Sequence, residues 1–158
     1  MNYGIAVILE YSKIHDGAHA PDRANPSDAG IDVFFSPGID EPQETVIEPT
    51  TSILLGTGLK FGIPHGYMLE VKNRSSWAYK FQLLVGACVI DSGYLGEVMI
   101  NLHNVGSLPR VVKSGDKIAQ IVMIPVIHFR PHLTSEEHLY EDELCVSSRG
   151  TGGFGSTG

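Results

Sequence analysis

The stretch GLKFGIPHGYMLEVK (residues 58–72) holds the pattern that decides the fold: two short apolar runs on either side of a segment with two glycines and a proline. Short runs rich in Val, Ile, Leu and Phe indicate strands, and Gly and Pro between them indicate turns. The eighteen glycines and nine prolines fall between such runs along the chain. The expected strands are residues 4–9, 31–35, 52–55, 58–61, 67–72, 97–104 and 117–125. The sequence therefore predicts an all-β fold.

The remaining segments predict little helix. Residues 76–83 have a weaker strand pattern that could form a helical turn, and the acidic segment 134–144 is expected at the surface. No segment repeats, so the strands must close on each other as a sandwich or barrel. A chain of 158 residues fits one domain, expected at residues 1–145, followed by a flexible glycine-rich C-terminal arm at residues 146–158.

Composition excludes several classes of function. A net charge of −7 argues against a nonspecific nucleic-acid surface, although a small anion needs only a few well-placed donors. No apolar run approaches the roughly 18 residues that span a bilayer, and the N-terminus lacks a secretory leader. We expect a cytoplasmic protein, or one inside the host cell if the gene is viral. Cys88 and Cys145 are expected to be free thiols, and the scattered histidines have no zinc-ligand spacing.

The C-terminal arm SSRGTGGFGSTG has the composition of a nucleotide clamp. Its small residues let backbone amides approach phosphate oxygens, Ser156 and Thr157 add hydroxyl donors, Arg149 adds a bidentate charge and Phe154 offers a ring to a base. It is not a Walker A loop, because no lysine follows its glycines. A glycine-rich linker is the alternative interpretation for such a tail taken alone.

Two internal stretches carry further chemistry. NRSSWA (residues 73–78) sets an arginine beside two hydroxyls, a combination that binds anions but also caps helices and turns. GACVIDSGYLGEV (residues 86–98) reads as a β-hairpin with Asp91 and Tyr94 at its tip. Either stretch alone is weak, because aspartates are common in turns.

Five stretches together resemble, in type, order and spacing, the five motifs of the trimeric dUTPase family. They are AGIDV (29–33), NRSSWA (73–78), GACVIDSGYLGEV (86–98), GDKIAQIVMIP (115–125) and RGTGGFGSTG (149–158). The resemblance spans nearly the whole chain. It implies a jelly-roll-like β-barrel of the dUTPase type, and hydrolysis of dUTP to dUMP and pyrophosphate (dUTP diphosphatase), which limits uracil in DNA and supplies dUMP for thymidylate synthesis.

The resemblance also implies a role for each motif residue. Asp91 is the general base for water attack on the α-phosphorus, and Tyr94 packs against the deoxyribose and excludes a 2′-hydroxyl. Backbone groups near the hairpin read the uracil edge, at Ala87, Cys88, Val89, Ile90 and Met99. Residues of two motifs hold the phosphates, namely Arg74, Ser75, Ser76 and Gln120, with Asp116 pairing with Arg74. The arm closes over the substrate with Arg149, Phe154, Gly155, Ser156 and Thr157.

The resemblance further implies a cofactor and an assembly. Mg²⁺ bridges the triphosphate oxygens, and Asp32 contacts it through water. Three chains form a homotrimer in which motif residues from different subunits build each site.

Departures from the family pattern keep two alternatives in view. Gly93, Leu95 and Cys88 stand where the family usually has other residues, and Gly93 together with Arg-Ser-Ser is similar to the related dCTP deaminases. Those enzymes need a glutamate where this chain has Asn101, and an amide cannot shuttle a proton, so hydrolase is favoured. A nucleotide-responsive binding protein with a regulatory protein partner is the other alternative, and the sequence leaves it open.

Overall fold

The structure is a computed structural model that describes residues 7–139 of the chain. These residues fall into two units, divided between Ile127 and His128. The first unit holds all the strands of the described part, and the second contains one short helix, α1 (Glu136–Leu139). The all-β prediction is confirmed.

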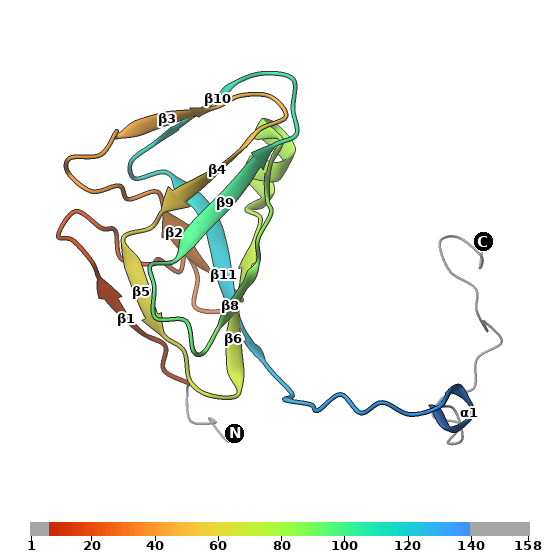
Figure 1. Cartoon of the computed structure of the whole chain (residues 1–158). Helices are drawn as coiled ribbons and strands as arrows, with labels where there is room; N and C mark the ends of the chain where they lie inside the picture. Colours follow the sequence, from red (N-terminus) through yellow and green to blue (C-terminus); the bar gives the residue numbers. More distant parts are fainter. Residues whose placement is uncertain (1–6, 140–158) are drawn as a thin grey trace. The chain divides into compact units, whose positions relative to one another are not determined.

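Two antiparallel sheets form most of the first unit (Figure 1). The four-stranded sheet has the order β2-β11-β6-β8, and its strands are β2 (Ile31–Phe34), β11 (Lys117–Pro125), β6 (Tyr67–Lys72) and β8 (Val89–Asp91). The three-stranded sheet has the order β4-β9-β7, and its strands are β4 (Ser52–Gly56), β9 (Met99–Asn104) and β7 (Leu83–Val85). Two ribbons pair β1 (Glu10–Lys13) with β5 (Leu59–Gly62), and β3 (Glu44–Ile47) with β10 (Arg110–Lys113).

Alternation along the strands places the core between these layers. In β9, Ile100, Leu102 and Asn104 are buried while Met99 and His103 face outward, the period of two expected of a half-buried strand. The largest fully buried side chains come from all parts of the first unit: Val33, Ile47, Leu55, Leu59, Leu69, Val98, Ile100, Leu102, Asn104, Val112, Ile118 and Ile121. The strands therefore bury one continuous apolar cluster.

Asn104 is one of three buried polar residues in residues 7–139, with Ser36 and Thr57, and it ties loops to this core. Its Nδ2 donates to the carbonyls of Ile47 and Leu108, both at 2.8 Å, and its Oδ1 accepts the Gly106 N–H at 3.0 Å. The nitrogen and the oxygen of the Asn104 side chain both have hydrogen-bond partners, so the burial of this amide is tolerated.

Most of the expected strands are confirmed, and two details are wrong. Residues 67–72 and 117–125 form β6 and β11 at the expected bounds, and residues 77–81 form a helical turn, η1 (Trp77–Phe81), of the π type. The strand expected at residues 4–9 lies partly outside the described residues, and residues 7–9 are not strand, since β1 begins at Glu10. No helix within residues 7–139 is long and apolar enough to span a membrane.

The second wrong detail is the hairpin expected at residues 86–98. Its first strand, β8, pairs with β6, and its second, β9, pairs with β4 and β7. The segment therefore crosses from one sheet to the other instead of folding back on itself. The tip keeps a turn, in which the Tyr94 N–H donates to the Asp91 carbonyl at 3.0 Å.

Candidate functional site

Three of the five motifs meet at one end of the four-stranded sheet. Asp32 on β2, Gln120 on β11 and Lys72 at the end of β6 are register partners across three neighbouring strands. Arg74, Ser75 and Ser76 follow Lys72 after one intervening residue, Asn73. Strand pairing therefore gathers side chains that lie up to 88 positions apart in the sequence.

Arg74 is held at two points at this end of the sheet. Its Nε donates to Asp32 Oδ1 at 3.0 Å and its Nη1 to the Lys117 carbonyl at 3.2 Å. The side chains of Arg74 and Asp32 are 27% and 16% exposed, so the pair is half-buried but open on one side. A guanidinium fixed in this way presents its remaining donors in a defined direction, as bidentate phosphate recognition requires.

Gln120 and the serines complete the cluster. Gln120 Nε2 donates to the Asn73 carbonyl at 2.9 Å, which joins β11 to the segment that carries Arg74. Ser75 is exposed and Ser76 is half-buried at the start of η1. Two hydroxyl-bearing residues thus follow Arg74 directly in the chain, one exposed and one half-buried.

Lys117 and Asp22 belong to the same cluster, and sequence reasoning missed both. Lys117 Nζ lies 3.0 Å from Asp32 Oδ2 and 2.6 Å from Asp22 Oδ2. Hydrogen bonds to Asp22 and then to Asp32 raise the pKa of Lys117, against a smaller opposing effect of burial. A charged residue at the start of the apolar strand 117–125 was the signal that could have identified it.

The expected pairing of Asp116 with Arg74 is wrong. The Asp116 carboxylate accepts the Lys113 N–H at 2.8 Å, and its own N–H donates to the Lys113 carbonyl at 2.9 Å. Asp116 therefore closes the turn between β10 and β11, the local role that aspartate commonly has. Asp32 takes the place beside Arg74.

The Asp91 segment lies elsewhere on the same sheet. Asp91 is exposed at the end of β8 and is the register partner of Met68 on β6. Met68 and Lys72 are four positions apart, which corresponds to roughly 13 Å along a strand. A single chain therefore does not bring Asp91 together with Arg74.

Tyr94 folds back over the turn that follows Asp91. Its hydroxyl donates to the Glu97 carbonyl at 2.8 Å, and a Cβ on Gly96 would lie only 2.5 Å from the hydroxyl oxygen. The Glu97 carboxylate accepts the Gly58 N–H at 2.7 Å, which anchors the turn to the segment between β4 and β5. The ring is 45% exposed and offers a face to solvent.

The residues expected to read the uracil edge lie on β8, on the segment before it and at the start of β9. Four of them are exposed and one is half-buried: Ala87, Cys88, Val89 and Met99 are exposed, and Ile90 is half-buried. Because β8 is the last strand of its sheet in the described residues, one edge of its backbone faces away from β6. Such an edge offers the alternating donors and acceptors that read a base. Among residues 7–139 the positive-φ residues other than glycine are Thr50 and Gln82, so Cys88 has an ordinary backbone and fits where the family has glycine.

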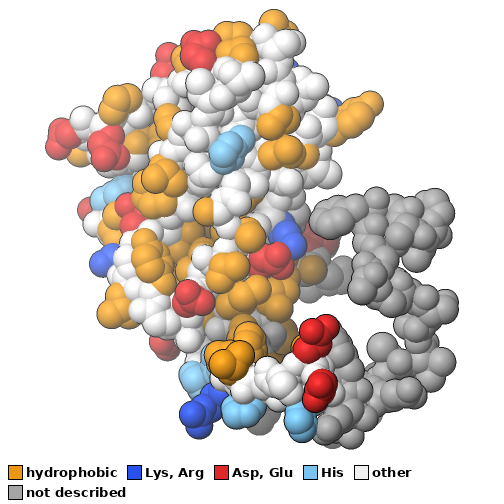
Figure 2. All heavy atoms as spheres, turned by 45° about the vertical axis from the view of Figure 1, so that its right-hand side comes forward, with side chains coloured by type: hydrophobic (Ala, Val, Ile, Leu, Met, Phe, Trp, Pro, Cys, Tyr) orange, Lys and Arg blue, Asp and Glu red, His pale blue; other side chains and the backbone are white. Residues whose placement is uncertain are grey.

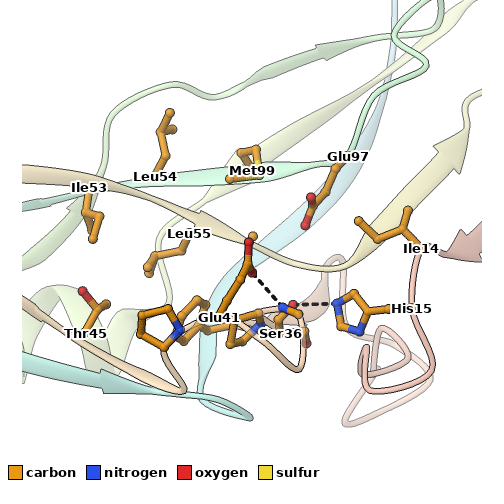
Figure 3. A pocket seen from close by; sticks show the side chains of 15 residues that line it. Ile14, His15, Ser36, Glu41, Thr45, Ile53, Leu54, Leu55, Glu97 and Met99 are labelled. Carbon is orange, nitrogen blue, oxygen red and sulfur yellow. Dashed lines mark hydrogen bonds between the residues drawn. The ribbon is translucent and has the colours of Figure 1, made fainter.

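Two cavities adjoin these clusters. One of about 250 Å³ is lined by Asp22, Asp28, Asp32 and Gln120 among others, beside the Arg74 cluster. Another, of about 420 Å³, is more apolar and reaches the expected site only at Met99. Figure 3 shows its wall, where His15 Nε2 lies 3.0 Å from the Ser36 carbonyl oxygen and the carboxylates of Glu41 and Glu97 point inward.

The expected site uses few Lys and Arg side chains, and the distribution of these side chains on the surface agrees with this. Figure 2 shows one face on which Lys and Arg side chains are sparse and separate. Within residues 7–139 no group of three or more His, Cys, Asp or Glu side chains is arranged to hold a metal. The expected arm residues Arg149, Phe154, Gly155, Ser156 and Thr157 lie outside the described residues.

Comparisons with known proteins identify the family to which the chain belongs. The dUTPase family model matches residues 16–158. A deoxyuridine 5'-triphosphate nucleotidohydrolase of Desulfitobacterium hafniense is 40% identical over 157 residues, 98% of this chain and 97% of that protein. A mutant dUTPase of Staphylococcus bacteriophage 80alpha, solved with dUpNHpp, is 26% identical with a TM-score of 0.77, covering 97% of this chain and 99% of that one. A mutant dUTPase of phage phi11 of S. aureus, whose structure reveals the coordination of a structural Mg(II) ion, is 25% identical with a TM-score of 0.71, covering 85% and 99%. The family match includes every stretch that holds an expected site residue.

Proposed function

Because the chain belongs to the dUTPase family and hydrolyses dUTP to dUMP and pyrophosphate, we propose that the Arg74 cluster binds the phosphates and that Asp91 activates the water. The observation that carries this proposal is the guanidinium of Arg74, held at 3.0 Å by Asp32 and at 3.2 Å by a backbone carbonyl, with its outer side open. The dCTP deaminase alternative is not favoured, since Asn101 offers an amide hydrogen-bonded to His103 where a proton-transferring carboxylate is needed.

At the phosphate end, Arg74 grips oxygens of the α and β phosphates with its unused donors. The hydroxyls of Ser75 and Ser76 add neutral donors, and Gln120, tied to Asn73, contacts a phosphate oxygen or an ordered water. Positioning and charge neutralisation are the main contributions that a protein makes to phosphoryl transfer.

At the reacting end, Asp91 accepts a proton from the attacking water, whose oxygen forms the new bond to the α-phosphorus. The bond to the bridging oxygen breaks, and pyrophosphate leaves with that oxygen. An exposed carboxylate at a strand end can meet both water and substrate, as a general base must.

Selectivity comes from the β8 edge and from Tyr94. Backbone groups of Ala87, Cys88, Val89, Ile90 and Met99 pair with the uracil edge, which distinguishes it from cytosine. The Tyr94 ring, fixed by its bond to the Glu97 carbonyl, stacks on the deoxyribose and leaves no room for a 2′-hydroxyl.

The separation of Arg74 from Asp91 along β6 supports a site shared between subunits of a homotrimer. Because Asp91 pairs with Met68 near the start of β6 while Arg74 follows the other end of this strand, at Lys72, the two residues of one site come from different chains. Mixing inactive Asp91→Asn and Arg74→Ala proteins after partial denaturation and refolding should restore dUTP hydrolysis. A mixture that stays inactive while forming mixed trimers would contradict the shared site.

Magnesium fits the donor set only in a water-mediated way. Both oxygens of Asp32 already pair with cations, and residues 7–139 offer no cage of three carboxylates. Mg²⁺ commonly keeps several waters and binds through substrate phosphates and one or two carboxylates. We assign Asp32 to the waters of such an ion, whose chemistry would be to neutralise the phosphate charge.

The arm residues Arg149, Phe154, Gly155, Ser156 and Thr157 stay predicted contacts with the γ-phosphate and uracil. A cytoplasmic location, the boundary at residues 145–146 and a regulatory protein partner stay predictions as well.

Pyrophosphate release in the presence of Mg²⁺ tests the function, with dUTP, dCTP, dTTP and UTP compared at equal concentration. The proposal expects release from dUTP alone. Ammonia release from dCTP would move the chain to the deaminases, and equal rates with dUTP and UTP would refute the role given to Tyr94.

A further inference from the structure

A bulge at the start of β11 controls where Lys117 points. Lys117 pairs with Phe34 and Ala119 pairs with Val33, so one extra residue, Ile118, lies between consecutive register pairs. Ile118 and Ala119 are both buried although they are neighbours, which departs from the alternation of a strand with one face in the core. In a regular strand, residues two positions apart share a face, so Lys117 would share the core face of Ala119; the bulge places them on opposite faces, because their partners Phe34 and Val33 are adjacent. Bulges of this kind re-aim side chains beside functional sites.

On the face to which the bulge turns it, Lys117 meets the acidic side chains beside Arg74. Its ammonium lies 3.0 Å from Asp32 Oδ2 and 2.6 Å from Asp22 Oδ2, and 5.5 Å from the centre of the Phe34 ring. Its backbone carbonyl accepts the Arg74 Nη1–H at 3.2 Å. Lys117 is therefore connected to Arg74 twice, directly through its backbone and indirectly through Asp32.

Asp32 is the link between the two cations. One oxygen accepts from Arg74 and the other from Lys117, so the carboxylate is fixed at both ends. Backbone bonds in both directions, of 2.7 and 3.1 Å, also tie Asp32 to Asp22. If the ammonium were removed, Oδ2 would lose its partner in a half-buried place, and the carboxylate could rotate away from Arg74.

We propose that Lys117 is a positioning residue for phosphate binding, which acts through Asp32 to hold the Arg74 guanidinium in the plane that receives the triphosphate. The proposal rests on the phosphate-binding role proposed above for Arg74. The charged groups that face Lys117 are Asp22, Asp32 and Arg74.

The test compares Lys117→Met, which keeps the length of the side chain and removes its charge, with Lys117→Arg, which restores a cation. Lys113→Met is the matched control, because Lys113 pairs at 3.7 Å with Glu44 in a fully exposed place. Affinity for dUpNHpp, with Mg²⁺, is measured by calorimetry beside affinity for deoxyuridine. Thermal unfolding of each variant is recorded as well.

We expect Lys117→Met to bind dUpNHpp about tenfold more weakly, a change of 1.4 kcal/mol, and deoxyuridine unchanged. Lys117→Arg should recover most of the affinity, and Lys113→Met should match the wild type. Equal losses for dUpNHpp and deoxyuridine, or no loss for either, would overturn the proposal, since a merely structural lysine gives the first and an idle one the second.

A double-mutant cycle decides whether Lys117 acts through Arg74. In the Arg74→Ala background, Lys117→Met should weaken dUpNHpp binding no further. A second tenfold loss there would mean that the lysine contacts the phosphates independently, and the positioning role would be refuted. Failure of the underlying function is distinguishable, because the wild type itself would then release no pyrophosphate from dUTP.

Discussion

Replacing Arg74 with lysine separates charge from geometry at the phosphate end of the site. Lysine keeps the positive charge but loses the planar fork that donates to Asp32 Oδ1 at 3.0 Å and to the Lys117 carbonyl at 3.2 Å. Each of these bonds, at a side chain 27% exposed, contributes about 1 kcal/mol to holding the cation in place. Loss of both costs about 2 kcal/mol, which predicts a fall of about 30-fold in kcat/KM for dUTP.

Steady-state pyrophosphate release measures this change, with deoxyuridine binding as the control for an intact base pocket. The loss should concentrate in nucleotides that carry phosphates and leave the affinity for deoxyuridine within about twofold. A lysine variant with the kcat/KM of the wild type would show that charge alone suffices, and the argument from the fixed guanidinium would fail.

Three further changes test other parts of the account. Gly30→Ala places a Cβ 2.6 Å from Gln120 Oε1 and should displace that side chain, so the KM for dUTP should rise several-fold. Gly62→Ala is the control, because the nearest atom to its new Cβ lies at 3.5 Å, and it should leave the KM unchanged. Asn104→Leu removes three buried hydrogen bonds and should lower the free energy of unfolding in urea by roughly 3 kcal/mol; an unchanged midpoint would contradict this. Because the folded-state pKa of Lys117 is raised, its stabilisation should be full up to the ordinary lysine pKa of about 10.4 and disappear as the pH rises through the folded value. The difference in unfolding free energy between wild type and Lys117→Met should therefore shrink in alkali, and a constant difference would rule the linkage out.

The sequence predicts the central strands well because their signals are local. β6 and β11 are long apolar runs, and their ends coincide with the expected ones. β3 (ETVI) and β10 (RVVK) were not among the expected strands, since each has only four residues and begins with a charged one, and Val46 and Val111 are about half exposed. Short strands of this kind are fixed by their partners more than by their own composition.

The partner strand of β8 could not be predicted from the local sequence pattern. A turn through Asp91 favours a hairpin, but β8 finds its partner in β6, about twenty positions earlier in the chain. The hydrophobic pattern of three residues cannot specify which strand edge they join. Tertiary packing makes that choice.

For the candidate site too, the sequence predicts the motif residues but not the contacts between residues far apart in the chain. The motifs predict Arg74, Gln120 and Asp91 as candidate site residues without any structure, whereas the predicted partner of Arg74, Asp116, was wrong. Asp116 satisfies a turn within its own segment, and Asp32, 42 positions from Arg74, takes the ion pair. A bond of such separation depends on the register of β2 against β11, which includes a bulge that composition does not reveal. Gly93 is a further case: it has no positive φ and its Cβ would meet nothing within 4 Å, so the backbone does not require glycine there.

The rate of pyrophosphate release from dUTP by the wild type and by Asp91→Asn tests the central claim most directly. The account predicts that the wild type hydrolyses dUTP with Mg²⁺ present, and that the amide variant, which binds dUpNHpp as tightly, loses at least about 100-fold in kcat, as expected when a general base is removed. An Asp91→Asn protein that turns over dUTP at the rate of the wild type would contradict it.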